Sequence, residues 1–162
     1  MTRIGLLSDT HSYLDPAIFG HFDTCQEVWH AGDVGAPDVS TQLANFRPLR
    51  IVSGNIDSSR DYPADLRFNL EGFPVWITHI GGVPPRYNPV VGPLLRANTP
   101  RLFVCGHSHI LKVVRDPALG GMLYLNPGAA GRSGFHTQRT CLRFTLHEGE
   151  ISNMQVIELG TR

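Results

Sequence analysis

The sequence predicts an α/β fold in which two packed β-sheets carry helices on their outer faces. Two observations indicate this fold. In the first half of the chain, short apolar runs alternate with helix-like segments, as in parallel sheets whose strands are joined by helices. In the last third, strand-like segments follow one another with turns between them, which favours antiparallel pairing. The length of 162 residues suits one domain, and we expect residues 1–162 to form it.

The first half is expected to contain three strands and two helices. Asp15 is in position to cap the first helix, and Pro16 would lie in its first turn. Pro48 follows the second helix closely and marks its end. The predicted segments are a strand at residues 4–8, a helix at 15–22, a strand at 27–30, a helix at 37–46 and a strand at 49–53.

The second half is expected to be richer in strands. Glu71 and Gly72 separate two strand-like runs, which predicts a hairpin. Turns are expected at Asp116-Pro117 and at Glu148-Gly149. The predicted segments are strands at 66–70 and 73–78, a helix at 89–98, and strands at 101–105, 111–115, 122–125, 140–147 and 151–158.

Composition and charge argue against several classes of protein. Apolar residues make up 41% of the chain and charged residues 17%, which is typical of a soluble globular protein. The formal net charge is zero and no basic cluster stands out, so nucleic acid is not an expected partner. No apolar run approaches the roughly 20 residues of a membrane span, so no membrane association is expected. A signal peptide before the first strand is not expected either.

The cysteines favour a reducing compartment. Cys25, Cys105 and Cys141 are odd in number, far apart and in no CxxC pair, so neither a disulfide framework nor a thiol-rich zinc site is expected. We interpret them as reduced core thiols of a cytoplasmic protein. An unpaired reactive thiol is the alternative.

Side chains that can bind metal ions follow five of the predicted strands. Each stands where its strand ends, and ligands of open α/β sheets bind at that edge. Three of these positions follow a glycine, which allows a sharp turn and a close approach of the backbone. The residues are Asp9 and His11 after the first strand, Asp33 after the second, Asn55 after the third, His79 after residues 73–78, and His107 and His109 after residues 101–105.

The donor types indicate a pair of transition-metal ions. Imidazole with carboxylate suits Mn, Fe, Co, Ni or Zn better than Ca or Mg, which prefer oxygen ligands alone. Seven donors are too many for one tetrahedral zinc and fit two ions that share one carboxylate. Asp9 and Asp33 would leave such a pair with excess positive charge, which favours an anionic substrate. Two ions about 3.5–4 Å apart suit phosphoryl transfer.

Each of these residues by itself has a more ordinary interpretation. An Asp or Asn after a strand is usually a cap or turn residue, and a lone His is usually on the surface or hydrogen-bonded. Their joint occurrence, in order and at successive strand ends, is much harder to explain by accident. The remaining histidines belong to no such motif and are expected to be surface or structural, with His30 the best placed for a hydrogen bond near the site. They are His21, His30, His136 and His147.

The sequence resembles the calcineurin-like metallophosphoesterases, in particular their small single-domain bacterial and archaeal phosphodiesterase branch. The resemblance spans essentially the whole chain. It is carried by Asp9-Thr10-His11, Gly32-Asp33-Val34, Gly54-Asn55, Thr78-His79 and Gly106-His107-Ser108-His109. It implies a four-layer α/β/β/α sandwich of two mixed β-sheets flanked by helices, with a dinuclear metal site at the carboxyl-terminal edge of the strands.

The resemblance also implies roles for the seven residues. The first ion would be held by Asp9, His11 and His109. The second ion would be held by Asn55, His79 and His107. Asp33 would bridge the two ions, and Asp33, Asn55 and His79 are the expected catalytic residues. Manganese is the first expectation for both ions, with Fe, Zn, Ni or Co as alternatives. Asn126-Pro127-Gly128 resembles a motif that lies near the site in this branch, and an ordinary Pro-Gly turn explains it equally well.

The implied function is a metal-dependent phosphoric ester hydrolase that cleaves small phosphodiesters with a metal-bridging hydroxide. Two alternatives stay open. One is a phosphomonoesterase or protein phosphatase, and the other is a non-catalytic scaffold or binding module of the same fold. The expected partner is a small phosphate-ester substrate, and a small homo-oligomer is compatible with the sequence.

One position departs from the family pattern. Many relatives have a histidine after Gly-Asn that assists the leaving group, whereas this chain has Ile56. Loss of a general acid typically costs about 10²–10⁴-fold in rate, so poor leaving groups would need a proton from water or from Asp57. Asp57 is instead expected to cap the next turn. Arg60 and Arg132 are candidate phosphate contacts but are expected to be solvated. The predicted rim of an open site is formed by residues 12–15, 81–88 and 131–138.

Overall fold

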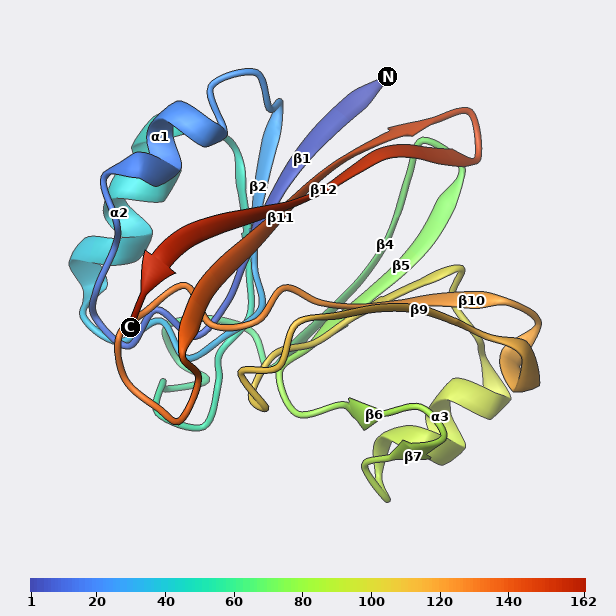
Figure 1. The fold of residues 1–162 in the computed structure, drawn as a ribbon. Coiled ribbons are helices and arrows are strands. Elements are labelled where there is room, and N and C mark those ends of the chain that lie inside the picture. The colour runs from blue at the N-terminus through green and yellow to red at the C-terminus, as the bar shows by residue number, and fades with distance from the viewer.

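Two five-stranded β-sheets form the centre of the computed structural model, which describes residues 1–162 (Figure 1). The strand order of the first sheet is β12 (Glu150–Thr161), β11 (Gln138–His147), β1 (Thr2–Leu7), β2 (Glu27–His30) and β3 (Leu49–Ile51). In this sheet β1, β2 and β3 are parallel and lie side by side. Beyond β1 the sheet continues with β11, which is antiparallel to β1, and then with β12, which is antiparallel to β11. The expected strand–helix–strand units of the first half are therefore confirmed.

The second sheet is also mixed. Its strand order is β4 (Asp65–Leu70), β5 (Phe73–Thr78), β8 (Leu102–Val104), β10 (Met122–Asn126) and β9 (Lys112–Asp116). The predicted hairpin is present, since β4 and β5 pair antiparallel with Leu70 opposite Phe73. Strands β5, β8 and β10 are parallel to one another.

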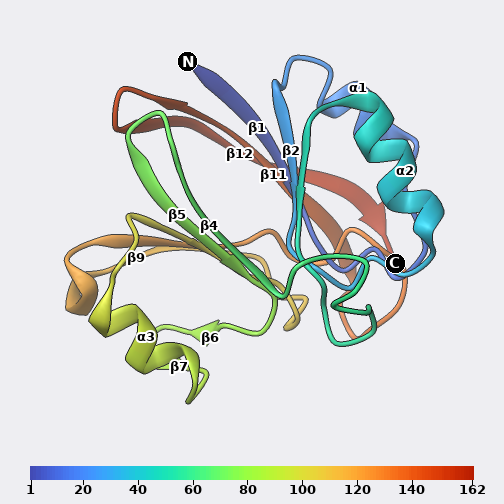
Figure 2. The ribbon, with the colours of Figure 1, turned by 180° about the vertical axis from the view of Figure 1, so that it is seen from behind.

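Helices cover the outer faces of both sheets. Figure 1 shows α1 (Ala17–His21) and α2 (Pro37–Phe46) outside the first sheet and α3 (Val91–Ala97) outside the second, and Figure 2 shows the same layers from behind. A small hairpin, β6 (Gly82–Val83) and β7 (Arg86–Tyr87), precedes α3, and a 3₁₀ turn (Pro117–Leu119) connects β9 to β10. The four-layer sandwich is confirmed. None of the helices is long and apolar enough to cross a membrane.

Three apolar clusters hold the four layers together. The largest lies between the two sheets and includes Trp29 and Phe144, whose rings meet edge to face at 5.7 Å. A second cluster lies between the first sheet and helices α1 and α2, where Ile18 and Leu43 are fully buried. The third packs α3, through Leu95, against the second sheet. Since burial of apolar surface is the main force in folding, these clusters set the relative position of the two sheets.

One strand pairs differently from the expectation for the last third. Strand β10 pairs parallel with β8 and antiparallel with β9, so it lies inside the second sheet rather than in an antiparallel meander. All five of its residues are buried, whereas most residues of the edge strand β9 are exposed. A continuous apolar run is typical of a strand that is covered on both faces. This signal in residues 122–125 therefore indicated a central strand.

Removing the Phe144 ring should destabilise the packing of the two sheets. Phe144→Ala should lower the free energy of unfolding by roughly 3–5 kcal/mol, because the side chain is fully buried between the sheets. Val156→Ala, on a side chain that is 47% exposed, should change it by less than about 0.5 kcal/mol. Urea denaturation of both variants measures the difference, and equal losses would contradict this description of the core.

Candidate metal centre

The carboxyl ends of strands from both sheets meet at one edge of the sandwich. Strands β1, β2 and β3 of the first sheet and strands β5 and β8 of the second each deliver side chains there. The structure brings the seven predicted residues together as two groups of three and an amide beside the second group. The donor atoms of Asp9, His11 and His109 lie within 4.8 Å of one another, and so do those of Asp33, His79 and His107. The amide oxygen of Asn55 lies 3.0 Å from His107 Nδ1 and 3.2 Å from His79 Nε2.

The backbone at these strand ends adopts an unusual conformation. Positive φ angles are uncommon for residues other than glycine and cost roughly 1–3 kcal/mol each, and they concentrate at functional sites. Five of the seven residues have them, namely Asp9, His11, Asp33, His107 and His109, with φ between 44° and 69°. The packed strands therefore hold these turns in a conformation that the residues alone would not favour.

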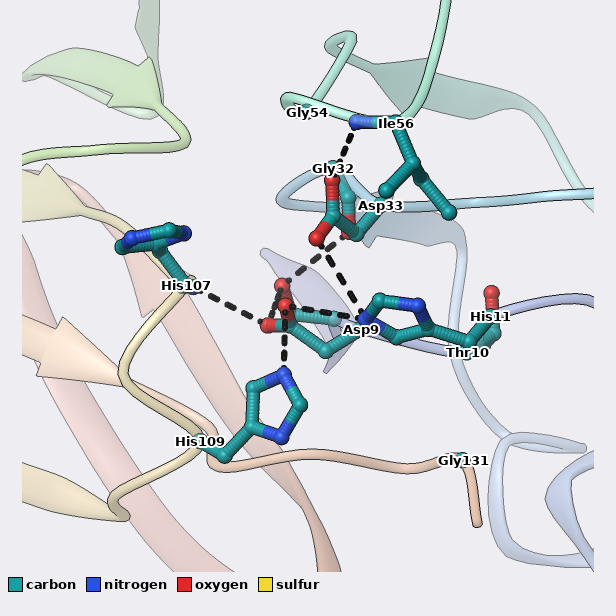
Figure 3. A network of polar contacts seen from close by, with 12 residues as sticks. Asp9, Thr10, His11, Gly32, Asp33, Gly54, Ile56, His107, His109 and Gly131 are labelled. Atoms are coloured by element: carbon teal, nitrogen blue, oxygen red, sulfur yellow. Dashed lines mark hydrogen bonds and ion pairs between the residues drawn. The ribbon is translucent and has the colours of Figure 1, made fainter. Parts of the chain in front are cut away.

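Asp33 has one anchored oxygen and one oxygen directed into the site. The N–H of Ile56 donates to Asp33 Oδ1 at 3.1 Å (Figure 3). The other oxygen, Oδ2, lies 3.3 Å from His11 Nε2 and 3.4 Å from His79 Nε2. One carboxylate oxygen thus stands between an imidazole of each group. Burial opposes ionisation of Asp33, but the hydrogen bond from His79, its charge and the Ile56 N–H outweigh burial and lower the pKa to about 2.

Asp9 is arranged in the same way. Its Oδ2 accepts from the Ser8 hydroxyl at 2.6 Å and from the His107 N–H at 3.1 Å. Its Oδ1 is buried and has no hydrogen-bond donor, and it lies 3.2 Å from His109 Nε2. Burial would raise the pKa of Asp9, but His109 and His79 together with Ser8 lower it below its usual value. Gly106 allows this close packing, because a Cβ at that position would collide with the Ser8 hydroxyl and crowd Asp9.

His79 presents a lone pair to the site. The carbonyl oxygen of Ala31 can only accept, so His79 Nδ1 donates to it at 2.7 Å. His79 Nε2 then faces Asp33 Oδ2, donating to that carboxylate when the ring is protonated and offering a lone pair to a cation when the ring is neutral. Burial lowers the pKa of His79, but Asp33 and Asp9 outweigh burial and raise it above its usual value.

His136 fixes the orientation of His109, a role that the sequence did not reveal. His136 Nε2 donates to the Gly131 carbonyl at 2.7 Å, because that oxygen can only accept. Burial lowers the pKa of His136, which favours the neutral ring. Its Nδ1 then accepts from His109 Nδ1 at 3.2 Å, so the neutral His109 ring has its lone pair on Nε2, which is directed at Asp9. His136 was expected to be a surface or structural residue, and its sequence position did not connect it with the site, because the contact with His109 depends on how residues 131–138 fold back.

Two further side chains support the loops. Asp57 accepts from the N–H groups of Val34, Gly35 and Gly54 at 2.8–3.0 Å, so it ties the loop after β2 to the loop after β3. It neither caps the next turn, as expected, nor directs a free oxygen into the site. Asn126 donates to the Gly106 carbonyl at 3.0 Å and to the Ser108 hydroxyl at 3.1 Å.

Asn126 therefore supports the turn that carries His107 and His109, and it also accepts from Gly128 N–H within its own Pro-Gly turn. Both interpretations of the Asn-Pro-Gly motif apply to this chain.

His30 is confirmed as a hydrogen-bonded residue near the site. It is fully buried, its Nδ1 accepts from Gly32 N–H at 3.1 Å, and its Nε2 lies 3.0 Å from the Thr10 hydroxyl. Thr10 and Gly32 belong to the loops that carry His11 and Asp33. Burial lowers the pKa of His30 to about 4, so the ring is neutral near pH 7.

The remaining predicted features lie around the centre or away from it. Arg132 stacks on the Tyr13 ring at 4.1 Å, and Arg60 is exposed. Of the predicted rim loops, residues 131–138 bring His136 to His109, and residues 81–88 line a pocket next to His107. All three cysteines are buried and free, as expected. His147 is half-exposed beside Glu71 and takes no part in the centre.

The donor arrangement fits cations. Around Asp33 and Asp9, lone-pair atoms of imidazoles and carboxylates face one another at 3.2–3.9 Å. Asp9 Oδ1 and His11 Nε2 are buried and have no hydrogen-bond partner. Buried polar atoms without partners are costly, and facing lone pairs repel unless a positive charge lies between them. The residues present are therefore suited to bind divalent metal ions.

Sequence comparisons find one matching family and two relatives. The domain family described as the calcineurin-like phosphoesterase superfamily domain matches residues 2–149. A probable metallophosphoesterase of Methanothermobacter thermautotrophicus is 34% identical over 139 residues, which cover 78% of this chain and 76% of the relative. A probable metallophosphoesterase of Methanocaldococcus jannaschii is 28% identical over 134 residues, with 78% and 67% covered.

Solved structures share the fold. Vps29 of Entamoeba histolytica complexed with Zn²⁺ is 17% identical with a TM-score of 0.75, and 97% of this chain and 98% of that chain are covered. A predicted phosphoesterase of Streptococcus pneumoniae is 21% identical with a TM-score of 0.68 and coverage of 98% and 89%. The phosphoesterase YfcE of E. coli is 20% identical with a TM-score of 0.61 and coverage of 94% and 98%.

Loss of the His136 ring should weaken metal binding. Groups that orient a metal-ligating histidine typically contribute 10–100-fold to affinity, so His136→Ala should raise the dissociation constant for Mn²⁺ by about 10–100-fold. Isothermal titration calorimetry of the metal-free protein measures this constant. His147→Ala removes a histidine outside the centre and should leave it unchanged, and equal affinities in both variants would contradict the role of His136.

Acid should destabilise the metal-free protein partly through His30. The unfolded state takes up a proton near pH 6.5, whereas the folded state does so only near pH 4, so stability is lost as the pH falls through this window. Between pH 7 and pH 4.5 the loss of this contribution is about 2–3 kcal/mol. His30→Gln should remove it, so the variant's free energy of unfolding should fall less than that of the wild type. Parallel urea titrations at the two pH values test this, and identical losses would contradict it.

Proposed function

The chain belongs to the calcineurin-like phosphoesterase superfamily, and on that premise we propose that it hydrolyses small phosphodiesters with two divalent metal ions. The observation that carries the proposal is the position of Asp33. Its Oδ2 lies 3.3 Å from His11 of the first group and 3.4 Å from His79 of the second. One carboxylate oxygen is thus within reach of an ion in either group, which is the arrangement that a pair of ions sharing a ligand requires.

The proposed ligand sets follow the two groups. Asp9, His11 and His109 would hold the first ion. Asn55, His79 and His107 would hold the second ion, and Asp33 would serve both. The Asn55 amide oxygen lies about as far from His79 as from His107, which supports its place in the second set. Manganese is our first expectation, with Fe, Zn, Ni or Co as alternatives, because imidazole and carboxylate donors suit these ions.

The side chains would position the substrate and the ions. When bound, two divalent ions supply a nucleophilic water and neutralise the charge of the phosphate. Asp33 would hold the two ions at a fixed relative position, because its other oxygen accepts a hydrogen bond from Ile56 N–H. His79 would stay rigid because Ala31 accepts its second ring hydrogen. Asn55 would add an amide N–H₂ group that can donate to a phosphate oxygen.

The residues around the centre favour diesters with good leaving groups. Ile56 is half-exposed beside Asp33 and cannot donate a proton from its side chain. Asp57 is engaged with three backbone N–H groups, so it is not placed to replace a missing acid. We therefore propose that water protonates the leaving group, and that esters of acidic alcohols are hydrolysed fastest.

A second candidate is a protein-binding scaffold. The likeness in fold to Vps29 is the observation that favours it. The complete set of seven donor residues and the two identified donor groups favour the enzyme. We further propose that residues 1–162 act as one domain in the cytoplasm, which the three free buried thiols support.

An assay with added Mn²⁺ tests the proposed activity. The protein should hydrolyse bis(4-nitrophenyl) phosphate faster than 4-nitrophenyl phosphate. Asp33→Asn should lower kcat/KM by about 10²-fold or more, because the metal ions of such sites lower the activation barrier by several kcal/mol. Asp38→Asn, which changes an exposed carboxylate on α2, should keep the wild-type rate. Absence of turnover with both esters would favour the scaffold.

Metal content tests the two ligand sets. The wild-type protein should bind two Mn²⁺ per chain, and His107→Ala and His109→Ala should each bind one at concentrations that saturate the wild type. The double variant should bind none. If both single variants lose both ions, or if both retain two, the assignment of these neighbouring histidines to different ions is wrong. Circular dichroism of each variant verifies that it is folded.

A further inference from the structure

A pocket of about 480 Å³ lies directly beside the second donor group. This volume is typical of small-molecule sites. One wall is formed by residues 80–89, which contain the β6–β7 hairpin, and the other by the turn and strand at 106–112. His107 lines the pocket and also belongs to the proposed ligand set, so an occupant of the pocket lies next to a phosphate held at the centre.

The pocket wall is apolar and partly aromatic. Ile80 and Val83 are each 39% exposed and Ile110 is 66% exposed, although all three are aliphatic. The two tyrosines of the wall have no free hydroxyl, because Tyr87 donates to Asp116 and Tyr124 donates to the Gly82 carbonyl, both at 2.6 Å. The half-buried Tyr87 therefore offers ring surface rather than a hydrogen bond, whereas Tyr124 is buried behind it, and the wall suits a flat apolar group.

The charges on the pocket are all positive. Arg86 and Lys112 line it, no carboxylate does, and neither cation takes part in an ion pair of this structure. Both side chains are exposed. Both cations are therefore free to pair with a ligand that carries a negative charge at the far end of its apolar part.

We propose that this pocket binds one organic arm of the substrate, and that the preferred substrates are phosphodiesters with an aromatic arm bearing a second anionic group. The inference rests on the proposed function, because the phosphate at the metal centre places the arm in the pocket. It goes further by naming the substrate class. Ile80, Val83 and Ile110 with the Tyr87 ring would contact the ring of the arm, and Arg86 and Lys112 would attract its charge.

Three non-hydrolysable ligands separate these contributions. Isothermal titration calorimetry with metal-loaded protein should give increasing affinity from methylphosphonate to phenylphosphonate to 4-carboxyphenylphosphonate. Burial of a phenyl ring should tighten binding by about 10-fold or more. The exposed cations should add about 2–5-fold for the carboxylate.

Variants assign each gain to the pocket. Val83→Ser with Ile110→Ser should bring phenylphosphonate to the affinity of methylphosphonate and leave methylphosphonate unchanged. Arg86→Gln with Lys112→Gln should remove only the gain from the carboxylate. Val113→Ser is the matched control, since Val113 is a 40% exposed aliphatic residue of β9 outside the pocket. It should preserve all three affinities.

Parallel hydrolysis of methyl 4-nitrophenyl phosphate distinguishes this inference from the proposed function. Turnover of this ester combined with equal affinities for the three phosphonates overturns the pocket inference alone. The predicted affinity order without any turnover supports the pocket as a ligand site and overturns the proposed phosphodiesterase. Failure of all three phosphonates to bind overturns the pocket inference as well.

Discussion

The Asp33 carboxylate is the interaction on which the centre depends. Its Oδ1 is fixed by a backbone N–H from the loop after β3, so its Oδ2 has one orientation, between His11 of the first sheet and His79 of the second. The relative position of the two sheets therefore decides whether Asp33 can contact both histidines. The apolar cluster between the sheets fixes this position. Asp57 ties the loop that carries Asp33 to the loop after β3.

Several features at this edge of the sandwich lower the stability of the folded chain. Five of the seven donor residues have positive φ angles, and Asp9 Oδ1 and His11 Nε2 are buried without hydrogen-bond partners. Such features lower stability unless a ligand offsets them. Hydrogen bonds from Ser8 and Asn126, and the one that His136 accepts from His109, fix the donor groups before any ion arrives. The centre is thus preorganised for cations. The packed sandwich supplies the stability that offsets the unfavourable features of the centre.

The sequence predicted most elements and the edge at which the seven side chains meet, because strand ends and their polar residues are local signals. The parallel partner of β10 was missed although its apolar run was visible, since partner choice depends on which strands lie beside it. The contact of His136 with His109 was missed because it joins residues 27 positions apart through an irregular loop. Asp57 was assigned to a local turn, whereas its three donors come from two loops that only the fold brings together.

The most direct test of the shared-ligand arrangement is electron paramagnetic resonance of the protein loaded with two Mn²⁺ per chain. Two ions joined through the Asp33 carboxylate should give the spectrum of an exchange-coupled pair. Asp33→Asn should convert it to the six-line signal of isolated Mn²⁺. A wild-type protein that binds two ions but shows only isolated signals, or that saturates at one ion, would contradict the account.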